Sequence, residues 1–181
     1  MRRGVNMQHR TLVLTLSVVL AVLSVPFASA HGDESTSGPT NLQIMLISIV
    51  LSASIYILIT RFLELQTCLS SPLVFALASF TGTVHILLGL NDNLLLFGGV
   101  GVIAILGFSF LVKFSQWQEK VARLGLGLGV AVMFGAYFVS NHDVHYILED
   151  YLGLTTKIAE LGIIILLMKE WNQGTSYREE E

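Results

Sequence analysis

Five long apolar runs, separated by short polar segments, make up most of the chain after residue 40. Each run is long enough, or nearly so, to cross the hydrocarbon core of a bilayer, which takes about 20 helical residues. The runs are uniformly apolar, whereas strands of a membrane barrel alternate, and a helix in lipid satisfies its own backbone hydrogen bonds. The sequence therefore predicts an all-α membrane bundle of five transmembrane helices, at residues 42–60, 73–90, 94–112, 121–139 and 152–168.

The first thirty residues have the three parts of a secretory signal peptide. Basic residues at the start precede an apolar stretch at 11–25, and small residues at 28–30 match the cleavage pattern. The apolar stretch is short for a membrane span, although an uncleaved N-terminal anchor is the alternative. We expect cleavage after Ala30, which leaves His31 as the first residue of an extracytoplasmic tail at 31–41.

Lysine and arginine are distributed unequally between the segments that flank the membrane domain, residues 42–168. With the mature N-terminus outside, the outer segments 31–41, 91–93 and 140–151 contain neither residue type. The segments on the opposite side contain six such residues: Arg61, Lys113, Lys120, Arg123, Lys169 and Arg178. Because lysine and arginine are enriched on the cytoplasmic side, we expect a multi-pass protein of the cell membrane whose tail, 169–181, lies in the cytoplasm.

The composition agrees with a membrane domain and argues against several classes of function. Hydrophobic residues make up 53% of the chain and charged residues only 13%, against about 25% in soluble domains. The net charge of -3 gives no reason to expect nucleic-acid binding, and Cys68, the single cysteine, excludes an intrachain disulfide or a thiolate-rich zinc site. No catalytic motif is visible, so we do not expect an enzyme. Gly125 and Gly129 in the fourth run form a small-xxx-small pair, which permits close packing within the chain or against another membrane subunit.

Every histidine of the predicted mature chain lies in or near an outer segment. His31, His142 and His145 fall in outer segments, and His85 lies near the outer end of the second apolar run. Carboxylates accompany them at Asp33, Glu34, Asp92, Asp143, Glu149 and Asp150. Imidazole and carboxylate groups bind divalent metals such as nickel, cobalt or copper, so the outer face is a candidate metal site.

His85 differs from the other histidines because it lies inside an apolar run. An ionisable group within a membrane helix is costly and is by default a functional candidate; the alternative is a neutral imidazole that hydrogen bonds to a neighbouring helix. Lys157 and Glu160 lie three residues apart in the last run. They form either a structural ion pair or a pair in which Lys157 extends outward, and Glu160 is deep enough to face the same cavity as His85.

Residues 82–97, GTVHILLGLNDNLLLF, resemble the signature of the HupE/UreJ membrane proteins, roughly G-x-x-H-[P or I]-L-x-G-x-D-H-L-L. His85, Gly89 and Asp92 can be laid on this pattern with one extra residue before Asp92, and Asn93 stands in place of the second histidine. That family typically has a signal peptide with a histidine soon after the cleavage site, and it is associated with nickel or cobalt entry for hydrogenases and ureases. The resemblance implies a permease that uses His85 and Asp92 as metal ligands.

Two functions of different classes are therefore predicted. The first is a protein that handles a divalent metal at its outer face, either a HupE-like permease or a metal-binding accessory protein, with the ligands His31, His85, Asp92, His142 and His145. The second is a non-catalytic helical subunit of a larger membrane complex, such as a respiratory or copper-dependent oxidase. A transporter needs polar groups through the inner half of the bilayer, where the first two runs offer only Ser48, Ser52, Ser54, Tyr56, Ser79 and Thr81. Metal binding without translocation does not need them.

Overall fold

The computed structural model describes residues 38–62, 70–112, 114–140 and 144–176, and these residues lie in helices or in short connections between them. The predicted signal peptide at 1–30, His31 and most of the tail at 31–41 lie outside these ranges. So do His142 and the last residues of the C-terminal tail. Throughout the described ranges the chain has no β-strand, which confirms the prediction of an all-α fold.

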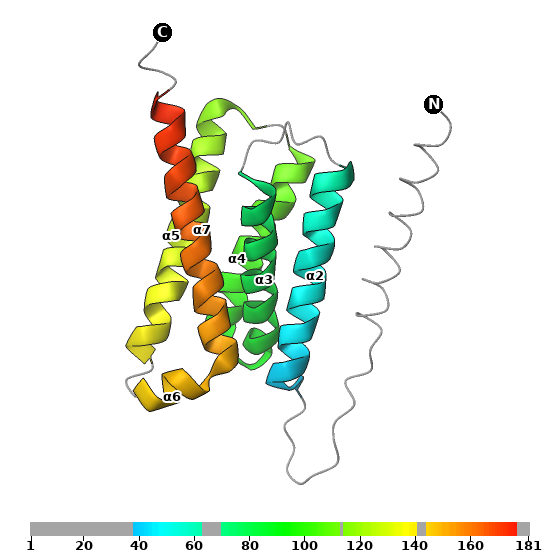
Figure 1. Ribbon diagram of the computed structural model, residues 1–181, viewed down its shortest axis with the longest axis vertical. Helices are drawn as coiled ribbons and strands as arrows, with labels where there is room; N and C mark the ends of the chain where they lie inside the picture. Colours follow the sequence, from blue (N-terminus) through cyan, green and yellow to red (C-terminus); the bar gives the residue numbers. More distant parts are fainter. Residues whose placement is uncertain (1–37, 63–69, 113, 141–143, 177–181) are drawn as a thin grey trace, which may run out of the picture.

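Five long helices run up and down and match the five predicted runs (Figure 1). They are α2 (Asn41–Phe62), α3 (Pro72–Leu88), α4 (Asn93–Leu111), α5 (Gln116–Ser140) and α7 (Tyr151–Ser176). A 3-10 turn, η1 (Gly89–Asn91), joins α3 to α4, and a short helix, α6 (Val144–Glu149), precedes α7 at the same end of the bundle. The helices α2, α4, α5 and α7 are long and apolar enough to cross a membrane. The chain is thus a membrane protein.

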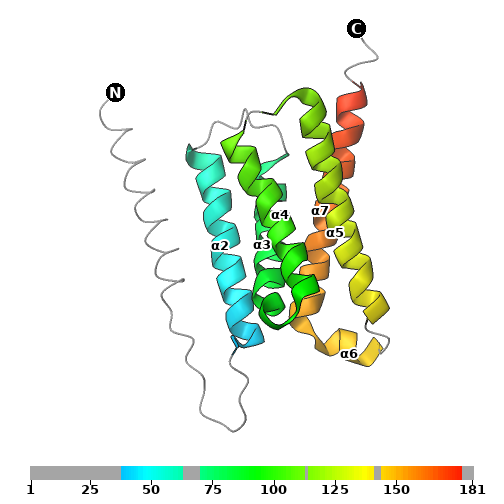
Figure 2. The same cartoon turned by 180° about the vertical axis from the view of Figure 1, so that it is seen from behind.

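The shortest of the five helices, α3, lies at the centre of the bundle. It packs against α2, α4 and α7 (Figures 1 and 2). Its side chains are almost all buried from Val74 to His85, whereas the other long helices expose many large apolar side chains. At 1.5 Å per residue, its 17 residues span about 25 Å. The neighbouring helices therefore surround α3, and their outward faces suit contact with lipid.

The start of α3 is tied to α7 at the end of the bundle opposite α6. Pro72 occupies the first turn, where a missing backbone N–H costs nothing. The Glu170 carboxylate accepts hydrogen bonds from the Ser71 backbone N–H at 3.0 Å and from the Ser70 hydroxyl at 2.6 Å. Glu170 thereby satisfies a helix start that has no side-chain cap of its own.

A close approach of backbones joins α3 to α4. A Cβ atom added to Gly99 would lie 2.7 Å from both the Gly82 carbonyl oxygen and the Ile86 nitrogen. A Cβ atom on Gly82 would lie 2.9 Å from the Ile103 side chain. These two glycines let α4 cross α3 closely, and this contact fixes the position of the C-terminal half of α3, which carries His85.

Replacing Gly99 by alanine should destabilise the protein by about 1–3 kcal/mol, because the new methyl group meets backbone atoms that have no room to move. Gly101→Ala is the matched control, since nothing lies within 4 Å of a Cβ atom at that position of the same helix. Unfolding in mixed detergent micelles measures both variants. Equal stability of the two would contradict the close approach.

Candidate functional site

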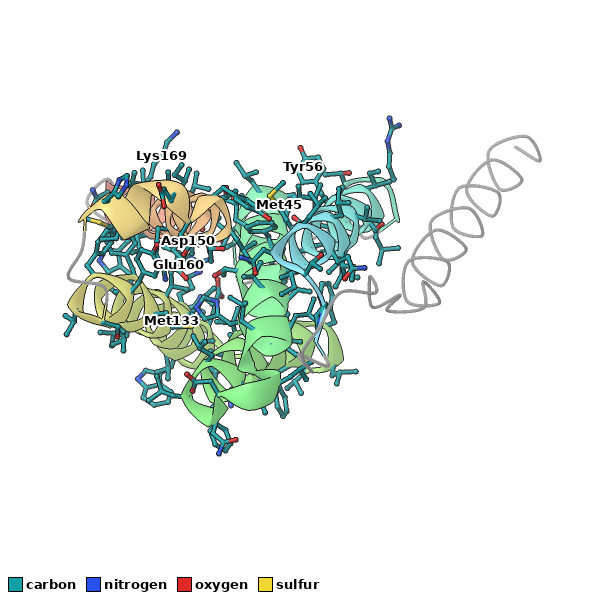
Figure 3. All side chains as sticks on the ribbon, turned by 90° about the horizontal axis from the view of Figure 1, so that it is seen from below. Met45, Tyr56, Met133, Asp150, Glu160 and Lys169 are labelled. Carbon is teal, nitrogen blue, oxygen red and sulfur yellow. The ribbon has the colours of Figure 1, made fainter. Side chains whose placement is uncertain are left out.

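Three ionisable side chains meet in the interior of the bundle: His85 of α3 with Lys157 and Glu160 of α7. Their exposed fractions are 5%, 5% and 0%. Lys157 Nζ lies 2.6 Å from Glu160 Oε2, on one face of the helix. The ion-pair alternative for these two residues is therefore confirmed. Figure 3, a view along the bundle, shows Glu160 and Asp150 in the space between α7 and α5.

The Lys157 ammonium also contacts α5. Its Nζ donates a hydrogen bond to the Met133 carbonyl oxygen at 2.9 Å and lies 5.3 Å from the centre of the Tyr137 ring. A carbonyl dipole and the face of an aromatic ring both attract a cation. Together with Glu160, Lys157 thus has three contacts of favourable sign in a region where an isolated ammonium would be costly.

The His85 ring is held by Thr81, one helical turn earlier. His85 Nδ1 lies 2.8 Å from the Thr81 carbonyl oxygen, and since a carbonyl only accepts, Nδ1 carries the proton. The Thr81 hydroxyl donates to Glu160 Oε1 at 2.9 Å and so links α3 to α7. In the neutral ring, His85 Nε2 then has a free lone pair, and it lies 3.6 Å from Glu160 Oε1.

The contact between His85 Nε2 and Glu160 Oε1 is unfavourable when no cation lies between the two atoms. Both atoms are acceptors when the imidazole is neutral, and 3.6 Å is too long for a hydrogen bond between them. Glu160 Oε1 is bonded to Thr81, whereas Lys157 neutralises the other oxygen, Oε2. A cation placed between Nε2 and Oε1 would interact favourably with both.

A cavity of about 410 Å³ adjoins this cluster at the end of the bundle that carries α6. Its wall includes His85 and Lys157, together with residues at helix ends, such as Asn41, Asp92 and Asp150. Because helix ends line it, the cavity extends from the end of the bundle to the edge of the buried cluster. This end is the predicted outer side.

A second polar pair lies in the wall of the same cavity. The Tyr137 hydroxyl donates to Asp150 Oδ2 at 3.0 Å, and Asp150 Oδ1 accepts from the Gly153 backbone N–H at 2.9 Å. Asp150 therefore caps the start of α7, where a negative charge is also favoured by the helix dipole. Tyr137 connects the two groups of residues, since its ring faces Lys157 and its hydroxyl reaches Asp150.

Of the five metal ligands predicted from the sequence, the structure brings two to this cavity. His85 and Asp92 both line it. Asp92 also caps α4, because its Oδ1 accepts from the backbone N–H groups of Leu94 at 2.9 Å and Leu95 at 3.4 Å. His145 lies on α6 with its side chain 81% exposed, 3.2 Å from Glu149, and is not part of the cavity wall. His31 and His142 lie outside the described residues.

The sequence indicated some members of the cluster and missed the roles of others. Thr81 stands four residues before His85, a spacing that places both on one helical face, and this signal could have identified it as the partner of His85. No local signal links Tyr137 to Asp150 or to Lys157. Over the ranges that the structure describes, no three histidine, cysteine, aspartate or glutamate side chains form a group able to hold a metal ion, so His85 and Glu160 stand as a pair.

No protein-family model matches the chain, and no curated protein or solved structure is significantly similar to it. The resemblance of residues 82–97 to the HupE/UreJ signature therefore remains a prediction.

Proposed function

We propose that this membrane protein binds a divalent transition metal such as nickel, cobalt or copper at the outer end of its helix bundle, with His85 and Glu160 as its protein ligands. The observation that carries the proposal is the 3.6 Å separation of His85 Nε2 and Glu160 Oε1, two acceptor atoms that face each other where His85 forms part of a cavity wall. In this reading the protein is a metal-binding accessory protein or a HupE-like permease.

The separation of the two atoms suits one shared ion. Metal–nitrogen and metal–oxygen distances near 2.1 Å allow donors that are 3.6 Å apart to bind the same ion, with an angle at the metal of about 120°. The Thr81 carbonyl holds the Nδ1 proton and leaves Nε2 free, as partners of metal-binding histidines commonly do. Two protein ligands leave the other coordination positions to small molecules from the cavity, which favours an exchangeable ion over a permanent one.

Asp92, another of the predicted ligands, fits an approach path. Asp92 lines the cavity and adds negative charge on the way to His85. Beyond the cluster, the bundle is filled by an apolar core that includes Phe75, Leu126 and Ile163. Capture at the outer face is therefore supported better than passage through the bundle, which would require a second arrangement of the helices.

Cobalt titration of the purified protein tests the proposal. We expect saturable binding to the wild type and at least a 10- to 100-fold loss of affinity in His85→Ala, because loss of an outer-shell partner alone typically costs that much and here a direct ligand is removed. Binding should also weaken as the pH falls, since a proton competes with the metal for Nε2. Glu119→Gln, which removes a carboxylate of the Glu119–Arg123 pair on α5, is the control for loss of charge alone. Equal affinity of the wild type and His85→Ala would exclude His85 as a ligand.

The subunit hypothesis has one observation in its favour. A Cβ atom added to Gly125 or Gly129 of α5 would have nothing within 4 Å, so this small-residue pair does not serve close packing within the described chain. Leu128 and Val132 on the same helix are exposed. We propose, as the second candidate, that another membrane subunit packs there. Native mass spectrometry of protein extracted from its own membrane should then show a complex that Gly129→Ile disrupts; a monomer before and after the substitution would argue against it.

A further inference from the structure

Lys157 contacts both the proposed metal site and the cavity that leads to it. Its ammonium neutralises Glu160 at 2.6 Å, while its side chain forms part of the cavity wall. We infer that Lys157 is a tethered cation that holds Glu160 in the metal-free protein and moves outward to Asp150 when a divalent metal binds to His85 and Glu160. The inference rests on the proposed function.

Charge balance makes the movement necessary. In the metal-free cluster the charges of Glu160 and Lys157 cancel, and His85 adds none when its imidazole is neutral. A divalent ion on Glu160 Oε1 would lie within a few ångströms of the ammonium on Oε2, and like charges repel strongly where water is scarce. Because an ammonium without a counter-ion is equally unfavourable inside the bundle, Lys157 needs another carboxylate to pair with.

Asp150 is that second carboxylate. It lies seven residues before Lys157 on α7, about 10 Å along the helix axis, and both side chains line the same cavity. Side chains on a helix lean toward its N-terminus, so the long Lys157 side chain can extend toward Asp150 more readily than toward residues further inward. The Tyr137 ring already contacts the ammonium, and its hydroxyl already contacts Asp150. Tyr137 therefore lines the path between the two carboxylates.

This exchange would give the site a preference for doubly charged ions. A monovalent ion brings no more charge to Glu160 than the ammonium it would displace. A divalent transition metal brings a second charge and also binds the imidazole nitrogen of His85, which together outweigh the loss of the Lys157 contact. Lys157 is thus a positioning residue. An ion can occupy the site only if it binds Glu160 and His85 more strongly than the Lys157 ammonium binds Glu160.

Amine labelling of the wild-type protein tests the movement without a substitution. A small water-soluble acylating reagent is applied to protein in lipid nanodiscs, with and without cobalt, and modification of Lys157 is followed by peptide mass spectrometry. We expect cobalt to speed the labelling of Lys157 several-fold, while the exposed Lys120 and Lys169 keep their rates as internal references. An unchanged or slower rate at Lys157 in cobalt-saturated protein would overturn the inference.

Cobalt titration of two variants supplies the second test. Lys157→Met should bind cobalt roughly tenfold more tightly than the wild type, because the competing cation is gone. Asp150→Asn should bind more weakly, since it keeps an oxygen that can cap α7 but loses the charge that receives Lys157. Lys120→Met is the control for removal of a lysine. If wild-type binding depends on His85 while Lys157→Met binds no more tightly, this inference fails and the proposed function stands. If the wild type binds no cobalt, both fail.

Discussion

Replacing Glu160 by glutamine should destabilise the metal-free protein by about 3–5 kcal/mol, the usual cost of removing one partner from a buried ion pair. The change leaves the Lys157 ammonium inside the bundle with a carbonyl and an aromatic ring as its remaining contacts. It also replaces the carboxylate oxygen that accepts from the Thr81 hydroxyl. Unfolding in detergent with a chelator present measures the loss free of any metal effect.

The double variant Glu160→Gln, Lys157→Met separates the ion pair from simple packing. It should recover most of the lost stability, because no unpaired charge remains in the interior. Glu119→Gln is the matched control, since Glu119 pairs with Arg123 at 2.6 Å in a partly exposed position, and exposed pairs contribute about 0–1 kcal/mol. A loss in Glu160→Gln no larger than in Glu119→Gln would mean that the buried pair does not stabilise the fold.

The helices could be predicted from the sequence because lipid imposes a simple rule on apolar runs. Their ends could not be predicted as well. The fourth run was expected to begin at residue 121, but α5 begins at Gln116, and α7 continues to Ser176, beyond the expected end at residue 168. Hydropathy reports only the part of a helix that suits lipid, whereas a helix continues into the polar interface as long as its backbone bonds are satisfied.

The candidate site was predictable where the signal is local and not where it depends on packing. His85 inside an apolar run and the three-residue spacing of Lys157 and Glu160 pointed to an interior cluster, and the structure places all three there. The bond from Thr81 to Glu160 joins residues that are 79 apart in the chain, and no pattern along the sequence encodes that contact. Asp92 shows a second reason why the sequence predicts the site only in part: the aspartate that was expected to be a metal ligand also serves as a helix cap.

The side of the membrane on which the cavity opens determines where a metal would be captured. Residues 91–93, 140 and 144–151 lie at the cavity end and contain no lysine or arginine, whereas Lys120, Arg123 and Lys169 lie toward the opposite end. Because positive residues are retained in the cytoplasm, the cavity should open outside. In intact cells, a membrane-impermeant label should therefore react with residues at the cavity end and not with residues at the opposite end.

Single-cysteine labelling in intact cells measures this orientation. Cys68 is the only native cysteine and lies in the segment between α2 and α3, so a membrane-impermeant maleimide should reach it only after permeabilisation. In a Cys68→Ser background, Asn93→Cys and Ser140→Cys should label in intact cells, because both positions are exposed at the cavity end, and Ser115→Cys at the other end should not. Labelling of Ser115→Cys but not of Asn93→Cys in intact cells would show that the bundle has the opposite orientation in the membrane. The cavity lined by His85 would then be supplied from the cytoplasm, and any metal that His85 and Glu160 hold would be an intracellular one.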